Sequence, residues 1–363
     1  MTARLGAGVR GAWPLDPEAA FLNHGSFGAT PTAVLEEQAR WRARLEEQPV
    51  DFLARRYWPL VAAARAEVAA FLGADPERLV FVPNATTGAA TVLASVVRPG
   101  DRAVVTDHVY PAVANTLAAR GAQVHVVAFD PDAPASVLLD AVDERARLVV
   151  VDAVTSGTAV RMPFEEVVRG CRARGVPCLV DAAHAPGLLP VDLTALDPDW
   201  WTGNLHKWVC APKGAAVLYA RSPVRPLVPS HGWGLGFQAE FDWAGTFDPS
   251  AWLSVPAALA FMDDLGWDEV RAHGRALAWD GAALTGLARP VPRGRQASMV
   301  LLDPGVMTYD EALALRDRLW AEARVEVGAT PWRGRGWLRA SAAPYNTLGD
   351  FERLAAALRT VRG

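Results

Sequence analysis

Cysteine is scarce in this sequence, with three residues in a chain of 363. Their number and spacing are wrong for a disulfide framework or for a zinc site built on thiolates. The N-terminus also lacks the continuous apolar segment of a secretion signal, and no run reaches the roughly 18 apolar residues that span a bilayer. We therefore expect a cytoplasmic protein with neither a metal site nor a membrane anchor. The cysteines are Cys171, Cys178 and Cys210.

Neither sign of charge dominates. The chain has 36 Lys and Arg residues against 40 Asp and Glu residues, a net charge of −4, which gives no electrostatic basis for binding nucleic acid or an anionic membrane. Internal repeats and low-complexity tracts are absent as well. The residues are 51% apolar and 21% charged, which is typical of globular proteins with a large core. The length indicates two domains, or one large domain with an appendage.

Short apolar runs alternate with helical patterns through the middle of the chain, after two amphipathic helices between residues 30 and 72. Strands that are apolar on both faces and separated by helices predict a mainly parallel sheet sandwiched by helices, an α/β fold. The predicted strands are residues 79–83, 102–107, 123–129, 148–154, 177–183 and 215–220, and predicted helices between them include 86–97, 111–121 and 163–175.

The pattern changes to α+β after about residue 250. Strands at 297–303 and 337–342 flank a helix that begins with a capping box, Thr308 and Glu311, and a last helix starts near Thr347. We predict an N-terminal arm (1–20), a large domain (21–250) and a small C-terminal α+β domain (251–363). The N-terminal segment of the large domain is expected to contribute to the small one.

Polar side chains follow the ends of the predicted strands, where open α/β sheets bind their ligands. Since the carboxyl ends of parallel strands share one rim, these residues are expected to form one site. They are Asn84, Ala85, Thr86 and Thr87, then Asp107, His108 and Tyr110, then Thr155 and Ser156, then Asp181 and His184, and finally Asn204, His206 and Lys207.

The segment PNATTGA (83–89) opens a predicted helix. Free backbone N–H groups and the positive end of the helix dipole suit a phosphate there, although an ordinary N-cap by Asn84 or Thr86 explains the same residues. The sequence contains no Walker A motif, and GWGLG (232–236) lacks the third glycine of a dinucleotide fingerprint. A nucleotide-binding α/β enzyme remains a rival interpretation.

Two charged residues stand where burial is costly. Lys207 follows an apolar run in GNLHKWVCAPKG (203–214), and Asp181 ends the strand CLVD, where it could also be a helix cap. One ligand explains both: pyridoxal 5′-phosphate needs a lysine for its aldehyde, an acid beside its pyridine nitrogen and a phosphate cradle. An aromatic ring stacked on the cofactor is also expected, from Tyr110 or His108.

The order of eight segments resembles the class V aminotransferase superfamily of fold-type I pyridoxal-phosphate enzymes. Within it the chain most resembles the isopenicillin N epimerase-like branch, related to the cysteine desulfurases. The resemblance runs from about Leu22 to Asn346 and implies a homodimer with sites shared between subunits. The segments are NATTGA, DHVYPA, TSGTAV, VDAAHAPG, NLHKWVCAPKG, SHGWG, GTFDPSA and LRASAAPYNT.

The resemblance also implies a role for each matching residue. Lys207 forms the Schiff base and moves the proton at the substrate Cα, Asp181 holds the pyridine nitrogen, and His184 lies on the side of the phenolic oxygen. The remaining cofactor residues are Ala85, Thr86, Asn204 and His206 for the phosphate, Tyr110 (with His108 second) for stacking, Thr155 near the ring, and Gly245 and Thr246 from the neighbouring subunit. Arg339 binds the substrate α-carboxylate, and Asn23 and His24 lie in a segment that closes over the site.

Two departures from the relatives bear on the reaction. Residues 325–341 contain no cysteine, so the persulfide chemistry of cysteine desulfurases is not expected. Phe247 follows Gly245 and Thr246 where this branch often has arginine, which leaves the amino-acid substrate open. Epimerisation, β-elimination and transamination all begin by removing the Cα proton, and an epimerase would need a second acid–base group, Tyr110 or His24.

A catalytically inactive homologue that acts as a scaffold or sensor is the non-enzymatic alternative, and a decarboxylating or oxidative enzyme of the same class is a further one. The joint presence of Lys207, Asp181 and Arg339 argues against an inactive protein.

Overall fold

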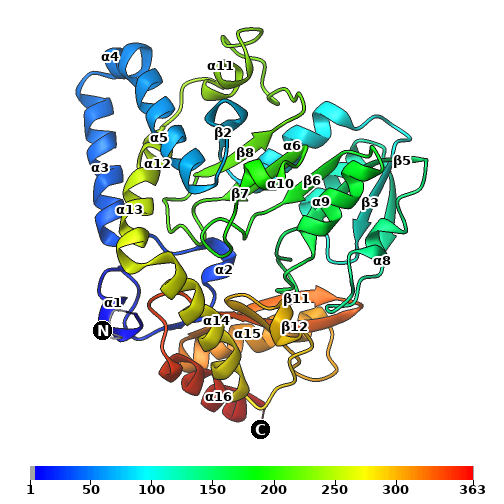
Figure 1. Cartoon of the computed structure of the whole chain (residues 1–363). Helices are drawn as coiled ribbons and strands as arrows, with labels where there is room; N and C mark the ends of the chain where they lie inside the picture. Colours follow the sequence, from blue (N-terminus) through cyan, green and yellow to red (C-terminus); the bar gives the residue numbers. More distant parts are fainter. Residues whose placement is uncertain (1–4, 363) are drawn as a thin grey trace.

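A seven-stranded sheet forms the centre of the larger part of the molecule (Figure 1). The strands are β2 (Leu79–Val82), β3 (Arg102–Thr106), β4 (Gln123–Val127), β5 (Ala146–Asp152), β6 (Cys178–Asp181), β7 (Trp200–Asn204) and β8 (Ala216–Ala220). The computed structural model describes residues 5–362. The strand order is β2-β8-β7-β6-β5-β3-β4, and β8 alone runs against its neighbours. The prediction of a mainly parallel sheet is confirmed.

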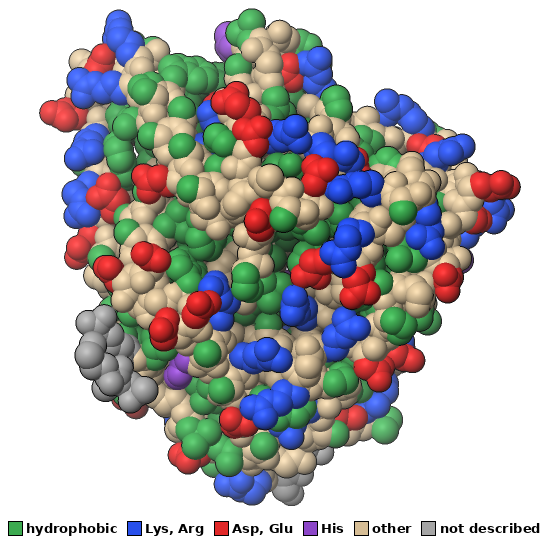
Figure 2. Space-filling model, viewed as in Figure 1, with side chains coloured by type: hydrophobic (Ala, Val, Ile, Leu, Met, Phe, Trp, Pro, Cys, Tyr) green, Lys and Arg blue, Asp and Glu red, His purple; other side chains and the backbone are tan. Residues whose placement is uncertain are grey.

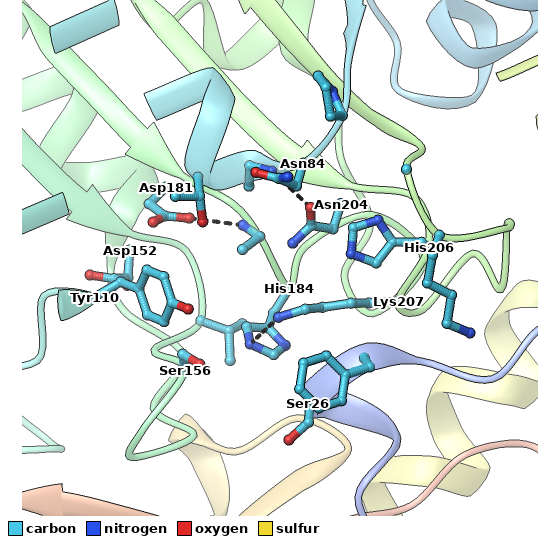
Figure 3. Close-up of a pocket in the computed structure, with 18 residues that line it drawn as sticks. Ser26, Asn84, Tyr110, Asp152, Ser156, Asp181, His184, Asn204, His206 and Lys207 are labelled. Carbon is cyan, nitrogen blue, oxygen red and sulfur yellow. Dashed lines mark hydrogen bonds between the residues drawn. The ribbon is translucent and has the colours of Figure 1, made fainter. Parts of the chain in front are cut away.

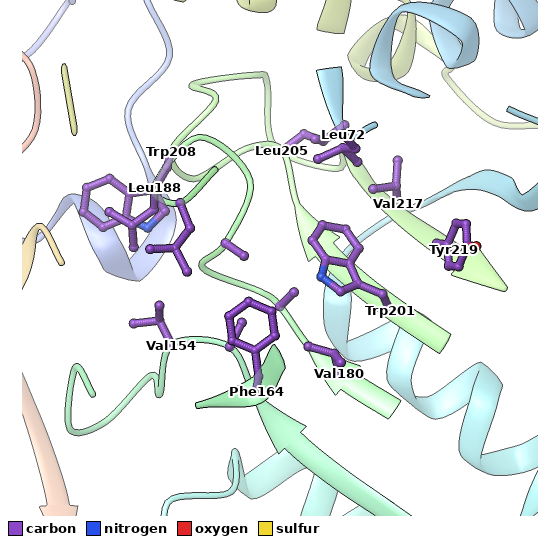
Figure 4. Packing of buried hydrophobic residues seen from close by; sticks show 14 of the residues in the cluster. Leu72, Val154, Phe164, Val180, Leu188, Trp201, Leu205, Trp208, Val217 and Tyr219 are labelled. Atoms are coloured by element: carbon purple, nitrogen blue, oxygen red, sulfur yellow. The ribbon is translucent and has the colours of Figure 1, made fainter. Parts of the chain in front are cut away.

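Helices cover both faces of this sheet because successive strand residues point to opposite sides and both sets are apolar. Val149 and Val180 pack in one core, which includes Trp201 and Phe164 (Figure 4), whereas Leu148 and Leu179 pack in the other. The connecting helices are α6 (Ala85–Val96), α7 (Pro111–Ala119), α8 (Ser136–Leu139), α9 (Phe164–Ala173), α10 (Leu193–Leu196) and α11 (Phe237–Asp242), with a 3₁₀ turn at Pro76–Arg78.

Helices from the two ends of the large part pack side by side, because α13 contacts both α3 and α5 (Figure 1). A π-helical segment that the sequence did not indicate, Phe52–Arg56, lies between α4 and α5. The bounds are α1 (Ala7–Arg10), α2 (His24–Phe27), α3 (Thr32–Glu47), α4 (Pro49–Asp51), α5 (Tyr57–Phe71), α12 (Ser250–Leu253), α13 (Val255–Leu265) and α14 (Trp267–Ala283).

The C-terminal part has its own antiparallel sheet, packed against helices, with β12 (Arg335–Ser341) between β11 (Gly328–Trp332) and β9 (Met299–Leu302). The predicted capping box at Thr308 and Glu311 is confirmed. A short N-terminal strand, β1 (Ala20–Phe21), pairs with β10 (Val325–Glu326), so the N-terminal segment lies against this part of the fold. The other elements are α15 (Tyr309–Ala323), α16 (Leu348–Arg362) and a 3₁₀ turn at Arg293–Arg295.

The surface carries charges of both signs. Figure 2 shows basic and acidic side chains interspersed over the face in view. Over residues 5–362, no helix is long and apolar enough to cross a membrane, and no group of three or more His, Cys, Asp or Glu side chains is arranged to hold a metal ion.

Candidate active site

A cavity of about 370 Å³ lies at the carboxyl ends of the central strands (Figure 3). Asp152, Asp181 and Asn204 line it, and they are the last residues of β5, β6 and β7. This is the rim where parallel sheets bind ligands. The predicted site residues that line the cavity are Asn84, Ala85, Thr86, Tyr110, Ser156, Asp181, His184, Asn204, His206 and Lys207.

Lys207 reaches into the cavity with only 8% of its surface exposed. Its Nζ lies 3.1 Å from Nε2 of His184, and Nε1 of Trp208 donates to Nδ1 of the same imidazole across 3.3 Å. Burial, assisted by the charge of Arg339, lowers the pKa of Lys207 to about 7. The amine therefore loses its proton near neutral pH, as a nucleophile or general base requires.

Two carboxyl groups share the opposite end of the cavity. Asp152 and Asp181 are partners in the register between β5 and β6, and both are buried. Burial raises the pKa of Asp181, while the N–H of Ala183, which donates to its Oδ1 across 3.0 Å, and the charge of Lys207 oppose the rise. Burial and repulsion by Asp181 raise the pKa of Asp152 well above its usual range. Asp181, which accepts the N–H of Ala183, suits a cationic ring nitrogen.

The N-terminus of α6 forms a third wall of the cavity. Oδ1 of Asn84 accepts from the N–H of Thr87, so the N-cap interpretation is confirmed. Oδ1 of Asn204 accepts from the N–H of Ala85 across 2.8 Å. This twelve-residue helix directs its dipole at the cavity, which suits a phosphate group.

His206 contributes a neutral ring to the same wall. Its Nδ1 lies 3.0 Å from the carbonyl oxygen of Ala215, and burial lowers its pKa to about 4. The sequence did not indicate a role for several other residues that line the cavity, among them Ser26, Phe27, Asp152 and Lys213. Asp152 carries the same signal as Asp181, an acid that ends an apolar strand.

A second cavity, of about 200 Å³, adjoins the first at Lys207 and contains Arg339. Arg339 is 7% exposed and donates to Oγ of Ser26 (2.8 Å), Oδ1 of Asn23 (3.3 Å) and the carbonyl oxygen of Ser156. Burial lowers the pKa of Arg339 to about 10. No carboxylate in the described part of the chain pairs with this guanidinium, so the cavity holds an uncompensated cation that suits a carboxylate ligand.

The structure does not bring His24 to either cavity. Its Nδ1 lies 2.8 Å from the hydroxyl of Tyr345 and its Nε2 lies 2.9 Å from the carbonyl oxygen of Lys207. The ring is fully buried, and burial lowers its pKa to about 4. His24 therefore contacts the backbone of Lys207 and lines neither cavity. Asn23 meets the site through its bond with Arg339.

Six other predicted residues also lie outside the lining of both cavities: Thr87, Asp107, His108, Thr155, Gly245 and Thr246. The ring of His108 stacks on Trp332 at 5.1 Å, whereas Tyr110 lines both cavities. Oγ1 of Thr155 is bonded to Thr158, 2.6 Å away. Gly245 and Thr246 lie on the connection between α11 and α12.

The polar groups around the first cavity match three functional groups of one cofactor. A buried neutral amine, a carboxylate and a helix N-terminus around one cavity fit the aldehyde, the ring nitrogen and the phosphate of pyridoxal 5′-phosphate. The fold and the site together define a pyridoxal-phosphate enzyme of fold type I.

Comparison with known proteins gives the family. The profile of the family described as Aminotransferase class-V matches residues 31–287. The chain belongs to this family, and pyridoxal 5′-phosphate is its cofactor. The chain is 32% identical over 403 residues to an isopenicillin N epimerase of Amycolatopsis lactamdurans, covering 99% of both proteins.

One further relative is similar in sequence, and one solved structure is similar in fold. A probable chloroplastic L-cysteine desulfhydrase of Arabidopsis thaliana is 31% identical over 393 residues, which cover 94% of this chain and 83% of the relative. The structure of a cysteine desulfurase from Thermococcus onnurineus superimposes with a TM-score of 0.83 at 21% identity, over 99% of both chains. The chain is thus an enzyme of the class V family with epimerase and C–S lyase relatives.

Proposed function

We propose that this enzyme removes the Cα proton of a cysteine derivative and eliminates its sulfur substituent from Cβ. The observation that carries the proposal is the position of Lys207, whose amine lines both cavities with a pKa lowered by burial to about 7. A single base in that position serves both proton transfers of a β-elimination.

Each group of the site has one role in the proposed reaction. Pyridoxal 5′-phosphate, bound through Lys207, supplies the electron sink that acidifies the Cα–H bond. Asp181 keeps the ring nitrogen protonated, and the N-terminus of α6, with Asn204 and His206, holds the phosphate. Arg339 holds the α-carboxylate of the substrate in the smaller cavity.

The proton balance needs no second side chain. Lys207 takes the proton from Cα, the Cβ–S bond breaks, and the same ammonium returns its proton to the departing sulfur. The products are a thiol and, after addition of water, pyruvate and ammonia. The L-cysteine desulfhydrase similarity supports this branch.

We also propose that no enzyme persulfide forms. The three cysteines of the chain are buried and none lines either cavity. A thiolate that must attack a substrate sulfur needs access to it, and burial raises the pKa of Cys210 to about 12.

Epimerisation is the second candidate, favoured by the 32% identity to isopenicillin N epimerase. The specific observation in its support is the side chain of Tyr110, which lines both cavities and is 38% exposed. Its hydroxyl is the candidate for the second acid–base group, because the buried ring of His24 has both nitrogens engaged.

We further propose a cytoplasmic homodimer in which Gly245 and Thr246 complete the site of the neighbouring subunit. An apolar groove of about 560 Å³ supports an interface near these residues. Such a surface suits contact between copies. Among its lining residues are Val50, Trp58, Leu235 and Trp243.

Three measurements on the pyridoxal-phosphate-loaded enzyme test the proposal. Borohydride reduction followed by peptide mapping should label Lys207 and leave Lys213, the only other lysine, unlabelled. In deuterated water, cysteine S-conjugates should exchange the Cα proton and release thiol, pyruvate and ammonia. Exchange with inversion at Cα and no release would favour epimerisation instead. No exchange with any amino acid would contradict both reactions.

A further inference from the structure

A third cavity, of about 370 Å³, lies beside the substrate cavity and shares one wall with it. The shared wall is Phe27, whose side chain is 74% exposed and also lines the cofactor cavity. Phe27 therefore presents an apolar ring at the meeting point of three cavities. The residues of the third cavity are Leu15, Asp16, Ala19, Phe21, Asn23, Phe27, Trp320 and Glu326.

One amide joins this cavity to the substrate cavity. Oδ1 of Asn23 accepts from Arg339 across 3.3 Å, and Nδ2 of Asn23 donates to Oε1 of Glu326 across 3.2 Å. The guanidinium that suits an α-carboxylate and the carboxylate of Glu326 are therefore two hydrogen bonds apart. A single amino-acid ligand can span that separation.

The two acidic residues of the third cavity differ in their partners. Asp16 has a cation, Arg324, at 4.0 Å, and that guanidinium also lies over the ring of Trp320. Glu326 is half-buried beside Phe21, its register partner, and within the described residues it belongs to no ion pair. A carboxylate without a cation, set among aromatic rings, has the composition of a site for a positively charged group.

We propose that this third cavity is a side-chain subsite that binds a cationic group of the substrate between Glu326 and the rings of Phe21, Phe27 and Trp320. The inference rests on the proposed function, since it places the α-carboxylate on Arg339 and the reacting carbons at Lys207. The side chain of the substrate then passes along the ring of Phe27 and ends at Glu326. The substrate class is a cysteine derivative whose sulfur carries a substituent with an ammonium or another organic cation.

The test compares two substrates of equal length on the loaded enzyme, S-(2-aminoethyl)-L-cysteine and neutral S-propyl-L-cysteine. A charge-assisted bond together with a cation–π contact gives the cationic substrate an advantage in kcat/KM of about 10- to 100-fold. Glu326→Gln keeps the acceptor for Asn23 but removes the charge, so it should reduce that ratio to about threefold, the part that the cation–π contact supplies. Glu322→Gln, on the exposed end of α15, is the matched control and should keep the wild-type ratio.

Phe27→Ala is the second variant, since this exposed ring can be removed without opening the core. It should lower the cationic preference about threefold or more through the lost cation–π contact. Equal kcat/KM values for both substrates in the wild type, or a ratio that Glu326→Gln leaves at the wild-type value, would overturn the subsite. Absence of Cα exchange with every amino acid would instead refute the proposed function, so the two failures are distinguishable.

Discussion

His184 donates a hydrogen bond to the amine of Lys207. The indole N–H of Trp208 can only donate, so Nδ1 of His184 must carry a lone pair, and the proton of the neutral ring lies on Nε2. Burial holds the pKa of His184 well below its usual range, which keeps the ring neutral. The amine of Lys207, 3.1 Å from Nε2, is then the acceptor, which is possible only in its unprotonated form.

The acid limb of the pH–rate profile should depend on His184. Replacing His184 with Ala removes a donor to the neutral amine and admits water, and both changes favour the ammonium form of Lys207. We expect the acid limb of Cα exchange to move up by about one pH unit, the equivalent of roughly one hydrogen bond. Trp208→Phe, which frees the ring to change tautomer, should give a smaller shift in the same direction. An acid limb that stays in place or moves down would contradict the assigned donor.

The stability of the cofactor-free protein should depend on the charge of Lys207. The pKa of this side chain falls from 10.5 to about 7 on folding because of burial. Its ammonium therefore destabilises the fold fully below pH 7, and the destabilisation disappears as the pH rises towards 10.5. We expect Lys207→Met apoprotein to melt at a higher temperature than wild type at pH 6, with the difference vanishing near pH 10. A difference that is constant across this range would show that the lysine is charged in the apoprotein throughout.

Arg339 should control substrate affinity rather than cofactor affinity. Loss of a charge-assisted bidentate bond to a carboxylate lowers kcat/KM by about 100-fold in Arg339→Gln. Arg339→Lys retains the charge but loses the planar fork, and we expect a loss of about 10-fold. Titration of the apoprotein with pyridoxal 5′-phosphate separates the two roles, since the cofactor should bind these variants as tightly as wild type. A weaker cofactor complex with an unchanged KM would contradict the assignment.

The sequence predicted those parts of the site that depend on local patterns. Asp181 and Lys207 could be identified because each follows an apolar strand, and strand ends of a parallel sheet meet at one rim. Asp152 carried the same signal and was missed because no motif singled it out. Periodicity located six strands of the central sheet, and caps such as Thr308 marked helix starts, whereas β7, β11 and the helices α13 and α14 were not predicted.

Packing between distant segments was not predictable in this way. His24 was expected to face the substrate, yet tertiary contacts with Tyr345 and with the backbone of Lys207 hold its ring behind the lysine. The link from Arg339 through Asn23 to Glu326 joins residues about three hundred positions apart. No spacing in a single sequence encodes such a contact, because it arises from the pairing of β1 with β10.

A buried ion pair should matter more for stability than any surface pair. Arg65 on α5 donates two hydrogen bonds to Asp242, and both side chains are 5% exposed. Arg65→Met leaves a buried carboxylate without its cation and should reduce the free energy of unfolding by about 3 kcal/mol or more. Urea denaturation measures this, with Arg40→Met, from an exposed pair with Glu37, as a control expected to cost below about 1 kcal/mol. Equal losses in the two variants would contradict the effect of burial.

Gly28 should prove necessary for both stability and activity because it packs against the peptide that precedes Lys207. It ends α2 with φ at +71°, and a Cβ there would overlap the carbonyl oxygen of His206 and come 3.0 Å from Cα of Lys207. Gly28→Ala therefore adds a steric clash to the strain of an alanine held at positive φ with ψ at 163°, a conformation that essentially only glycine adopts and that costs about 1 to 3 kcal/mol. Gly100→Ala is the matched control, since Gly100 has φ at +88° and no neighbour within 4 Å of an added Cβ.

We expect urea denaturation to show a loss of about 1 kcal/mol in the free energy of unfolding for the control and a larger loss for Gly28→Ala. Only Gly28→Ala should also slow Cα exchange, because relief of the clash displaces the backbone of Lys207. Equal losses of stability with unchanged exchange would mean that the loop shifts without moving the lysine.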